Sequence, residues 1–247
     1  MTNILEFITS KNYLNAPGVE KPQPIKLNIP EWYKNLNHSM TDRTIKGCMP
    51  FLDALSAGYL LRCPQDLFFN YGLQTKKGEP DVAYKNSLQE QPIIVSEGTN
   101  LNTDTPESHA ARQYPDPIVQ KQQGTRPVLK IANPWIIKTP PGYSCLFTSP
   151  LNNHHYPWKI ISGIVDTDAF HKEINFPFSV DTEKIENEDK TFVIEKGTPY
   201  VQVIPFKREN WKMRIKTRVP GDRSGIFYPL KLVHIYKSMF WTKKSWK

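Results

Sequence analysis

Short apolar runs, separated by turn-forming residues, repeat along the second half of the chain. The separators include Asn133-Pro134, Pro140-Pro141-Gly142 and Lys196-Gly197-Thr198-Pro199. Runs of this length and spacing are typical of strands joined by tight turns, as in a sandwich or barrel. The pattern predicts strands over residues 128–132, 135–138, 143–148, 158–165, 174–180, 192–195, 200–207 and 212–218.

The N-terminal part has a different pattern. Residues 1–43 are polar and proline-spaced, and they predict an arm laid over the rest of the protein. In the next segment Pro50 suits the first turn of a helix and Gly58 ends the apolar pattern. We therefore expect a short N-terminal helix at the start of a single β-rich domain, residues 44–247.

A hairpin is predicted between the short helix and the strand-rich half. The apolar runs 67–71 and 82–84 flank the turn-rich residues 76–80, and residues 93–95 form a further short strand. Residues 97–123 contain few apolar positions, so they predict a long surface excursion.

Composition supports a mainly β fold. Proline (22 residues) and glycine (12 residues) favour strands and turns over long helices. The chain has no apolar run of about 18 residues, and its first residues lack the features of a signal peptide. Cys48, Cys63 and Cys145 are odd in number and lack zinc-type spacing. These features predict an intracellular protein, not secreted through a signal peptide, with no membrane partner, cofactor or metal.

The net charge of +8 is concentrated at the C-terminal end. Residues 207–247 hold 12 Lys or Arg against Glu209 and Asp222, which gives 12 − 2 = +10 and leaves −2 for the remainder. An anionic partner is therefore expected to meet this basic segment. Residues 230–241 are apolar and predict a last helix or a last strand, and we favour the helix.

Within the basic segment, alternate residues of the predicted strand 212–218 are cations. Period two places Lys212, Arg214, Lys216 and Arg218 on one face, and Trp211 lies beside them. Such a stripe suits an acidic protein partner or, with Trp211 stacking on a base, a nucleic acid. It also suits a charged outer face that discourages edge-to-edge aggregation.

Three segments resemble the core of the dUTPase and dCTP deaminase superfamily, which has the β-clip fold. They are Pro140 to Thr148, Ser162 to Phe170 and Lys196 to Pro205. The resemblance implies a β-clip or related sandwich or barrel. It also implies that, in a hydrolase, Asp166 would activate the attacking water. Phe170, one residue beyond the family spacing, would support the deoxyribose, and Gln202 would match the family's glutamine.

The positions that hold phosphate depart from that family. Its Arg-Ser-Gly motif is replaced by Thr148-Ser149-Pro150-Leu151, which contains no cation, and its glycine-rich terminal motif has no clear counterpart. A phosphate chain needs several donors or a metal held by carboxylates. The adjacent His154-His155 pair would point to opposite faces of a strand, so no metal site is predicted with Asp166, Asp168 and His171. This chemistry favours a protein that is not an enzyme.

The whole chain also resembles an uncharacterised family of tailed-phage and bacterial proteins, through residues 29–36, 44–59 and 241–244. We therefore expect a structural or assembly protein of a tailed-phage virion, forming homo-oligomers or binding other virion proteins in the host cytoplasm and in the particle. The first alternative is a divergent dUTPase-like nucleotide-binding protein or nucleotide pyrophosphatase. The second is a nucleic-acid-binding module that uses the basic C-terminal segment.

Overall fold

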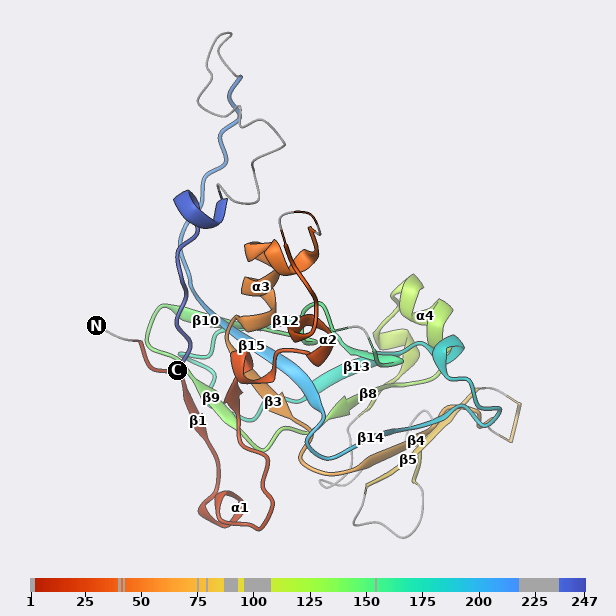
Figure 1. Ribbon diagram of the computed structural model, residues 1–247. Helices are drawn as coiled ribbons and strands as arrows, with labels where there is room; N and C mark the ends of the chain where they lie inside the picture. Colours follow the sequence, from red (N-terminus) through yellow and green to blue (C-terminus); the bar gives the residue numbers. More distant parts are fainter. Residues whose placement is uncertain are drawn as a thin grey trace.

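The computed structural model describes residues 3–39, 41, 43–74, 76–78, 80–86, 93–95, 108–153, 155–217 and 236–247. Over these residues the protein is mainly β, as predicted, with four antiparallel sheets and a few short helices (Figure 1). In the described part of the chain no helix is long and apolar enough to cross a membrane.

A five-stranded sheet forms the centre of the molecule. Its order is β12 (Gly163–Val165), β10 (Tyr143–Thr148), β15 (Pro199–Lys207), β3 (Tyr59–Arg62) and β2 (Gln23–Pro24). β10 and β15 pair along their length, from Tyr143 opposite Lys207 to Thr148 opposite Gln202. The two ends of β10 therefore lie beside opposite ends of β15.

Two four-stranded sheets and a two-stranded sheet complete the β structure. The first has the order β11 (Trp158–Ile160), β13 (Phe176–Val180), β8 (Val128–Ile131) and β7 (Ser108–His109). The second has the order β14 (Thr191–Ile194), β4 (Leu67–Asn70), β5 (Val82–Asn86) and β6 (Ile93–Val95). β1 (Glu6–Ile8) pairs with β9 (Ile136–Lys138). The predicted hairpin is the β4–β5 pair.

The helices are short. They are α1 (Lys11–Leu14), α2 (Glu31–Lys34), α3 (Met49–Ser56) and α4 (Pro117–Gln123), with 3₁₀ turns at Ile25–Asn28, Ile45–Gly47, Ala111–Gln113 and Thr182–Lys184. α3 is the short helix that the sequence predicts. α4 begins where the Asp116 side chain accepts hydrogen bonds from two backbone N–H groups of the first turn, so part of the predicted excursion is helical.

One buried apolar cluster draws on all three larger sheets. In several strands, such as β10 and β13, alternate residues face it, which is the period expected for a strand with one buried face. Its members include Leu61, Phe69, Phe147, Phe178 and Val203. Each such side chain stabilises the fold by about 1.5–3 kcal/mol when it is removed from water.

The structure differs from the predicted strands at two places. The single strand predicted over residues 158–165 is divided into β11 and β12, which belong to different sheets. The strand predicted over 212–218 does not form in residues 212–217, because the chain leaves the central sheet after Lys207 and rises away from it (Figure 1). Arg218 lies outside the described residues.

Both terminal segments contact the central sheet. The predicted N-terminal arm, residues 1–43, contributes β1 and β2 to two sheets. Tyr59 of β3 packs edge-on against Phe7 and against Trp246, with ring centroids 5.6 and 6.2 Å apart. Of the predicted C-terminal helix, the described part is one π-helical turn, Tyr236–Phe240.

Candidate functional site

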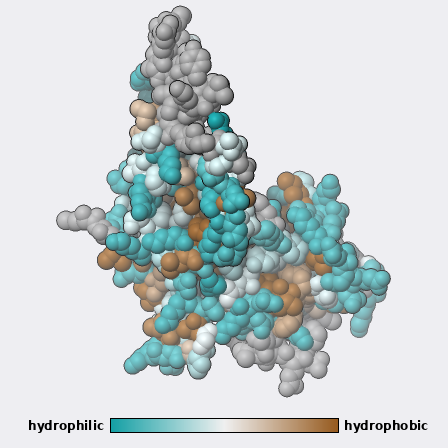
Figure 2. Space-filling view, viewed as in Figure 1, coloured by the Kyte–Doolittle hydropathy of each residue, from teal (hydrophilic) through white to brown (hydrophobic). Residues whose placement is uncertain are grey.

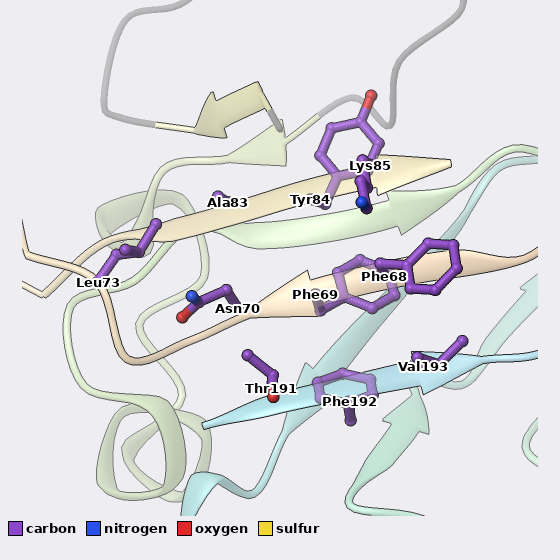
Figure 3. Close-up of a pocket in the computed structure, with 10 residues that line it drawn as sticks. All are labelled: Phe68, Phe69, Asn70, Leu73, Ala83, Tyr84, Lys85, Thr191, Phe192 and Val193. Atoms are coloured by element: carbon purple, nitrogen blue, oxygen red, sulfur yellow. The ribbon is translucent and has the colours of Figure 1, made fainter. Parts of the chain in front are cut away.

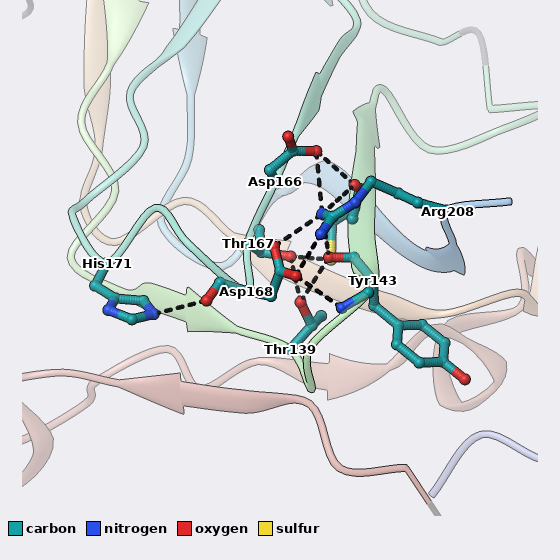
Figure 4. Close-up of polar contacts among 10 residues, drawn as sticks. Thr139, Tyr143, Asp166, Thr167, Asp168, His171 and Arg208 are labelled. Atoms are coloured by element: carbon teal, nitrogen blue, oxygen red, sulfur yellow. Dashed lines mark hydrogen bonds and ion pairs between the residues drawn. The ribbon is translucent and has the colours of Figure 1, made fainter. Parts of the chain in front are cut away.

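The turn after β12 presents two carboxylates beside the start of β10. Cys145 lies opposite Val165 in the β10–β12 register, so the residues that follow Val165 reach Ser144 (Figure 4). The turn is closed by its own backbone, because the N–H groups of Ala169 and Phe170 donate to the Asp166 carbonyl at 3.0 and 2.9 Å. The predicted Asp166 is therefore held on a rigid loop.

Asp168 is the less exposed carboxylate of the pair, with a side chain that is 10% exposed. It accepts hydrogen bonds from the Gly142 backbone N–H at 2.8 Å and from two guanidinium nitrogens of Arg208. The Arg208 hydrogen bonds, and then the Gly142 N–H, lower the pKa of Asp168 to about 2. Asp168 is thus ionised at neutral pH and fastens three chain segments together (Figure 4).

Asp166 has a different environment. Its side chain is 63% exposed, and one oxygen accepts a hydrogen bond from the Ser144 hydroxyl at 2.7 Å. The same oxygen lies 3.2 Å from an Arg208 nitrogen, while the other oxygen points away from the cluster (Figure 4). Asp166 is therefore oriented by two partners and keeps one oxygen open to solvent, as a base that accepts a proton from water requires.

The groups below the two carboxylates are structural. The hydroxyls of Thr139 and Thr167 lie 2.8 Å apart, and Thr167 also lies 3.4 Å from the Cys145 sulfur. Burial raises the pKa of the Cys145 thiol to about 11, so the thiolate that a nucleophile needs is not formed at neutral pH.

His171 does not complete a metal site. Its Nε2 lies 3.0 Å from the Asp168 carbonyl, and Figure 4 shows the ring directed away from the carboxylates. Within the ranges that the structure describes, no three His, Cys, Asp or Glu side chains are grouped as metal ligands would be. His154 lies outside those ranges.

A cavity of about 250 Å³, lined by polar and apolar side chains, lies at the other end of β10. It includes Thr148-Ser149-Pro150-Leu151, the segment that occupies the place of the phosphate motif, and further residues from β11 and its approach. Lys159 of β11 lines the same cavity and supplies a cation that the local motif lacks. The alternation of buried Trp158, exposed Lys159 and buried Ile160 was the signal that could have identified this lysine.

Aromatic and amide groups complete the cavity wall. Tyr156 stacks on Trp158 with ring centroids 5.0 Å apart and planes 17° from parallel. The buried Asn153 Oδ1 has no hydrogen-bond partner within the described part of the protein. The cavity thus combines a flat aromatic wall, a cation and polar side chains, which is the mixture found in sites for small polar ligands.

Gln202 holds the loop that lines this cavity. Its side chain is completely buried and accepts a hydrogen bond from the Leu151 N–H at 2.8 Å. Its amide nitrogen donates to the carbonyls of Ala54 and Ala57, at the end of α3. Gln202 therefore joins the cavity loop to α3 and does not face solvent.

The carboxylates and the cavity lie at opposite ends of β10. Asp166 is next to Ser144, whereas the cavity begins at Thr148, and four strand residues span about 13 Å. Phe170, the other residue expected near a sugar, is 42% exposed on the Asp166 turn. Within one chain, therefore, Asp166 does not lie at the cavity that Lys159 lines.

The predicted partner-binding residues lie apart from both features. The side chains of Trp211, Lys212, Arg214 and Lys216 are exposed on the segment that follows β15. Arg208 is the first residue of this segment, and it was not predicted from the sequence. The signal that could have identified it is a cation directly after an apolar strand, where an ion pair can form at the end of a sheet. On the face shown in Figure 2, hydrophobic side chains form separate patches among hydrophilic ones.

A larger, mostly apolar groove of about 550 Å³ lies on the β14–β4–β5 face (Figure 3). Phe68, Ala83 and Val193 line it, and Lys85 lies over the Phe68 ring, 5.3 Å from its centroid. The described residues that line it include no acid and no histidine. The groove therefore offers neither a carboxylate nor an imidazole, whereas the Asp166 turn presents two carboxylates.

Comparison with known proteins gives matches among solved structures alone. No protein-family model matches the chain, and no curated protein matches its sequence. Two of the matched structures are the following phage dUTPases. The Staphylococcus bacteriophage 80alpha dUTPase with dUpNHpp is 14% identical, has a TM-score of 0.38, and the match covers 89% of this chain and 91% of that chain. A variant dUTPase from phage phi11 of S. aureus, described with a structural Mg(II) ion, is 13% identical and has a TM-score of 0.37. That match covers 87% of this chain and 97% of that chain.

These matches agree with the predicted resemblance to the dUTPase-like superfamily. The prediction of a non-enzymatic virion component was wrong: the matched structures reported above are phage enzymes, which favour the dUTPase-like alternative. At such low identity and TM-score the likeness assigns no role to any residue of this chain. Those roles rest on the geometry of the Asp166 turn and the Lys159 cavity.

Proposed function

We propose that this chain is a divergent, dUTPase-like nucleotide pyrophosphatase. The observation that carries the proposal is the cation at the cavity: Lys159 lines the wall that contains Thr148-Ser149-Pro150-Leu151 and so compensates for the missing motif cation. Lysine is a common phosphate-binding residue because its ammonium group is a compact charge with three donors. Tyr156, stacked on Trp158, offers a flat surface for a nucleobase on the same cavity.

In this proposal Asp166 is the general base. Its open oxygen accepts a proton from water as the water oxygen forms a bond to the α-phosphorus of the nucleotide. The bond from that phosphorus to the bridging oxygen breaks, and pyrophosphate leaves. Ser144 and Arg208 are positioning residues because they hold the other side of the carboxylate.

The proposal includes a homo-oligomer. Since Asp166 and the Lys159 cavity lie at opposite ends of β10, a complete site needs Asp166 of one chain to face the cavity of another. The described residues do not gather metal ligands, so a divalent ion would enter with the phosphate chain of the substrate.

The direct test measures pyrophosphate release from each deoxynucleoside triphosphate with magnesium. We expect release from at least one of them, and a loss of at least about a hundredfold in Asp166→Asn, the usual scale for removing a general base. Glu188→Gln, at an exposed carboxylate on a distant loop, is the matched control and should retain activity. Absence of release from every deoxynucleotide would overturn the proposal.

A complementation assay tests the shared site. Asp166→Asn and Lys159→Gln should each be inactive alone, yet equal amounts mixed after dissociation and reassembly should regain activity. If each site takes one residue from each of two chains, about a quarter of the sites in a random mixture are intact. Two inactive variants with no gain on mixing would show that one chain holds the whole site, and activity in either variant alone would show that its altered residue is not needed.

A further inference from the structure

The segment after β15 is an extended arm, residues 208–217, whose side chains face solvent. No strand or helix forms in it, and it rises away from the sheets (Figure 1). Trp211, Met213 and Ile215 are 88%, 84% and 85% exposed. Such exposure of three large apolar side chains at alternate positions is unusual for a surface that contacts water alone.

The arm is fixed where it leaves the body. The Arg208 backbone N–H donates to the Gly142 carbonyl at 2.8 Å, and the Arg208 side chain is held by Asp168. The later part of the C-terminal segment is also anchored, since Lys244 forms an ion pair with Asp53 at 2.6 Å. The arm is therefore presented in a defined place on the molecule.

Its cations have a regular spacing. Lys212, Arg214 and Lys216 alternate with Met213 and Ile215, and in an extended chain residues two apart are separated by about 6.6 Å. None of these three cations pairs with another described residue, whereas Lys207 and Arg208 pair with carboxylates. Three cations are thus available at a repeat comparable to that of successive phosphates in an extended single strand.

The positive net charge of the chain lies in its C-terminal segment. Residues 207–247 carry a net charge of +10, and the remaining residues sum to −2. An isolated aromatic ring with both faces exposed, as in Trp211, is what base stacking requires. The apolar side chains of Met213 and Ile215 would be covered by the next bases along the strand.

We propose that the arm binds single-stranded nucleic acid. Lys212, Arg214 and Lys216 contact successive phosphates, and Trp211 stacks on a base. Recognition of this kind does not depend on sequence, because every base has a π face and every nucleotide has a phosphate. The site is separate from the Asp166 turn and from the Lys159 cavity.

The test uses the full chain and a labelled oligothymidine of about 16 nucleotides, with binding followed by anisotropy over a range of salt concentrations. Three phosphate contacts predict a slope near −2 in a plot of log affinity against log salt. The triple variant Lys212→Gln, Arg214→Gln, Lys216→Gln should lose that slope. Trp211→Ala should weaken binding roughly tenfold while keeping the slope.

A matched triple variant, Lys121→Gln, Lys138→Gln, Lys172→Gln, removes three exposed cations from the body and should bind as the parent does. Undetectable binding, or equal losses in both triple variants, would overturn the proposal. Light scattering gives a further test. If the free protein self-associates and Trp211→Ala abolishes this self-association, the arm is an interface between proteins and the proposal is overturned.

Discussion

Arg208 donates hydrogen bonds to both carboxylate oxygens of Asp168 and so ties the end of β15 to the turn after β12. The same guanidinium reaches Asp166, which keeps a free oxygen. The two neighbouring carboxylates therefore differ: Asp168 holds the loop, and Asp166 keeps one oxygen open to solvent.

The first prediction concerns acid stability. Because the folded pKa of Asp168, about 2, is below its ordinary value of 3.8, its ionised form stabilises the fold above that ordinary value, and this stabilisation is lost as the pH falls toward 2. Asp168→Asn should lower the melting temperature near neutral pH, and the difference from the parent should vanish near about pH 2. Thermal unfolding across this pH range measures it.

Asp189→Asn, at an exposed loop carboxylate, is the control for that series and should follow the parent curve. A constant difference between Asp168→Asn and the parent at all pH values would contradict the assignment, since it would mean that the charge of Asp168 has no part in the effect.

The second prediction concerns the thiols. Burial raises the pKa of Cys63 to about 12 and that of Cys145 to about 11, whereas Cys48 is partly exposed. At about pH 8 a disulfide reagent should modify one thiol quickly and the other two on unfolding alone. Cys48→Ser should remove the fast phase, and a fast phase that persists would show that a buried thiol is accessible.

The third prediction concerns Gln202. Gln202→Leu keeps the volume but leaves the Leu151 N–H and two carbonyls at the end of α3 without their partner. We expect a loss of about 1–3 kcal/mol in the free energy of unfolding, measured in urea. Gln120→Leu, on the exposed side of α4, should change it by less than about 0.5 kcal/mol. Equal effects would show that the buried amide is not needed.

The fourth prediction compares two glycines with positive φ. Gly58 has φ of 76°, and a Cβ there would lie 2.1 Å from the Val203 carbonyl oxygen, whereas Gly142 has φ of 85° with open space around it. Gly142→Ala should cost about 1 kcal/mol from backbone conformation alone. Gly58→Ala should cost more than about 3 kcal/mol, because backbone atoms must also move. Chemical denaturation of both variants measures the difference.

Local patterns predicted much of the fold. The boundaries of β10 and the pairing of β4 with β5 follow from alternation and turn residues, which act over a few positions. The division of the 158–165 run could not be predicted in this way. Which sheet each half joins depends on β13 and β10, which are distant in sequence.

The candidate site shows the same limit. A motif predicts Asp166 as a site residue, and its exposed carboxylate lies on the turn after β12. Lys159 and Arg208 were missed, because each acts on residues of another segment: Lys159 through a cavity shared with the 148–151 loop, and Arg208 through an ion pair across 40 positions. Such partners are set by strand register and not by local spacing.

The basic arm has one further consequence, for proteolysis. A protease with trypsin-like specificity binds an extended chain and cuts after Lys or Arg, and residues 212–216 offer three such bonds in an exposed extended segment. Limited digestion should cut here well before it cuts the sheets. Since the arm lies outside the buried core, the body should keep its fold after this cut. A single cut would open the arm without releasing it, because Arg208 holds its start to Asp168 and Lys244 holds the later segment to Asp53.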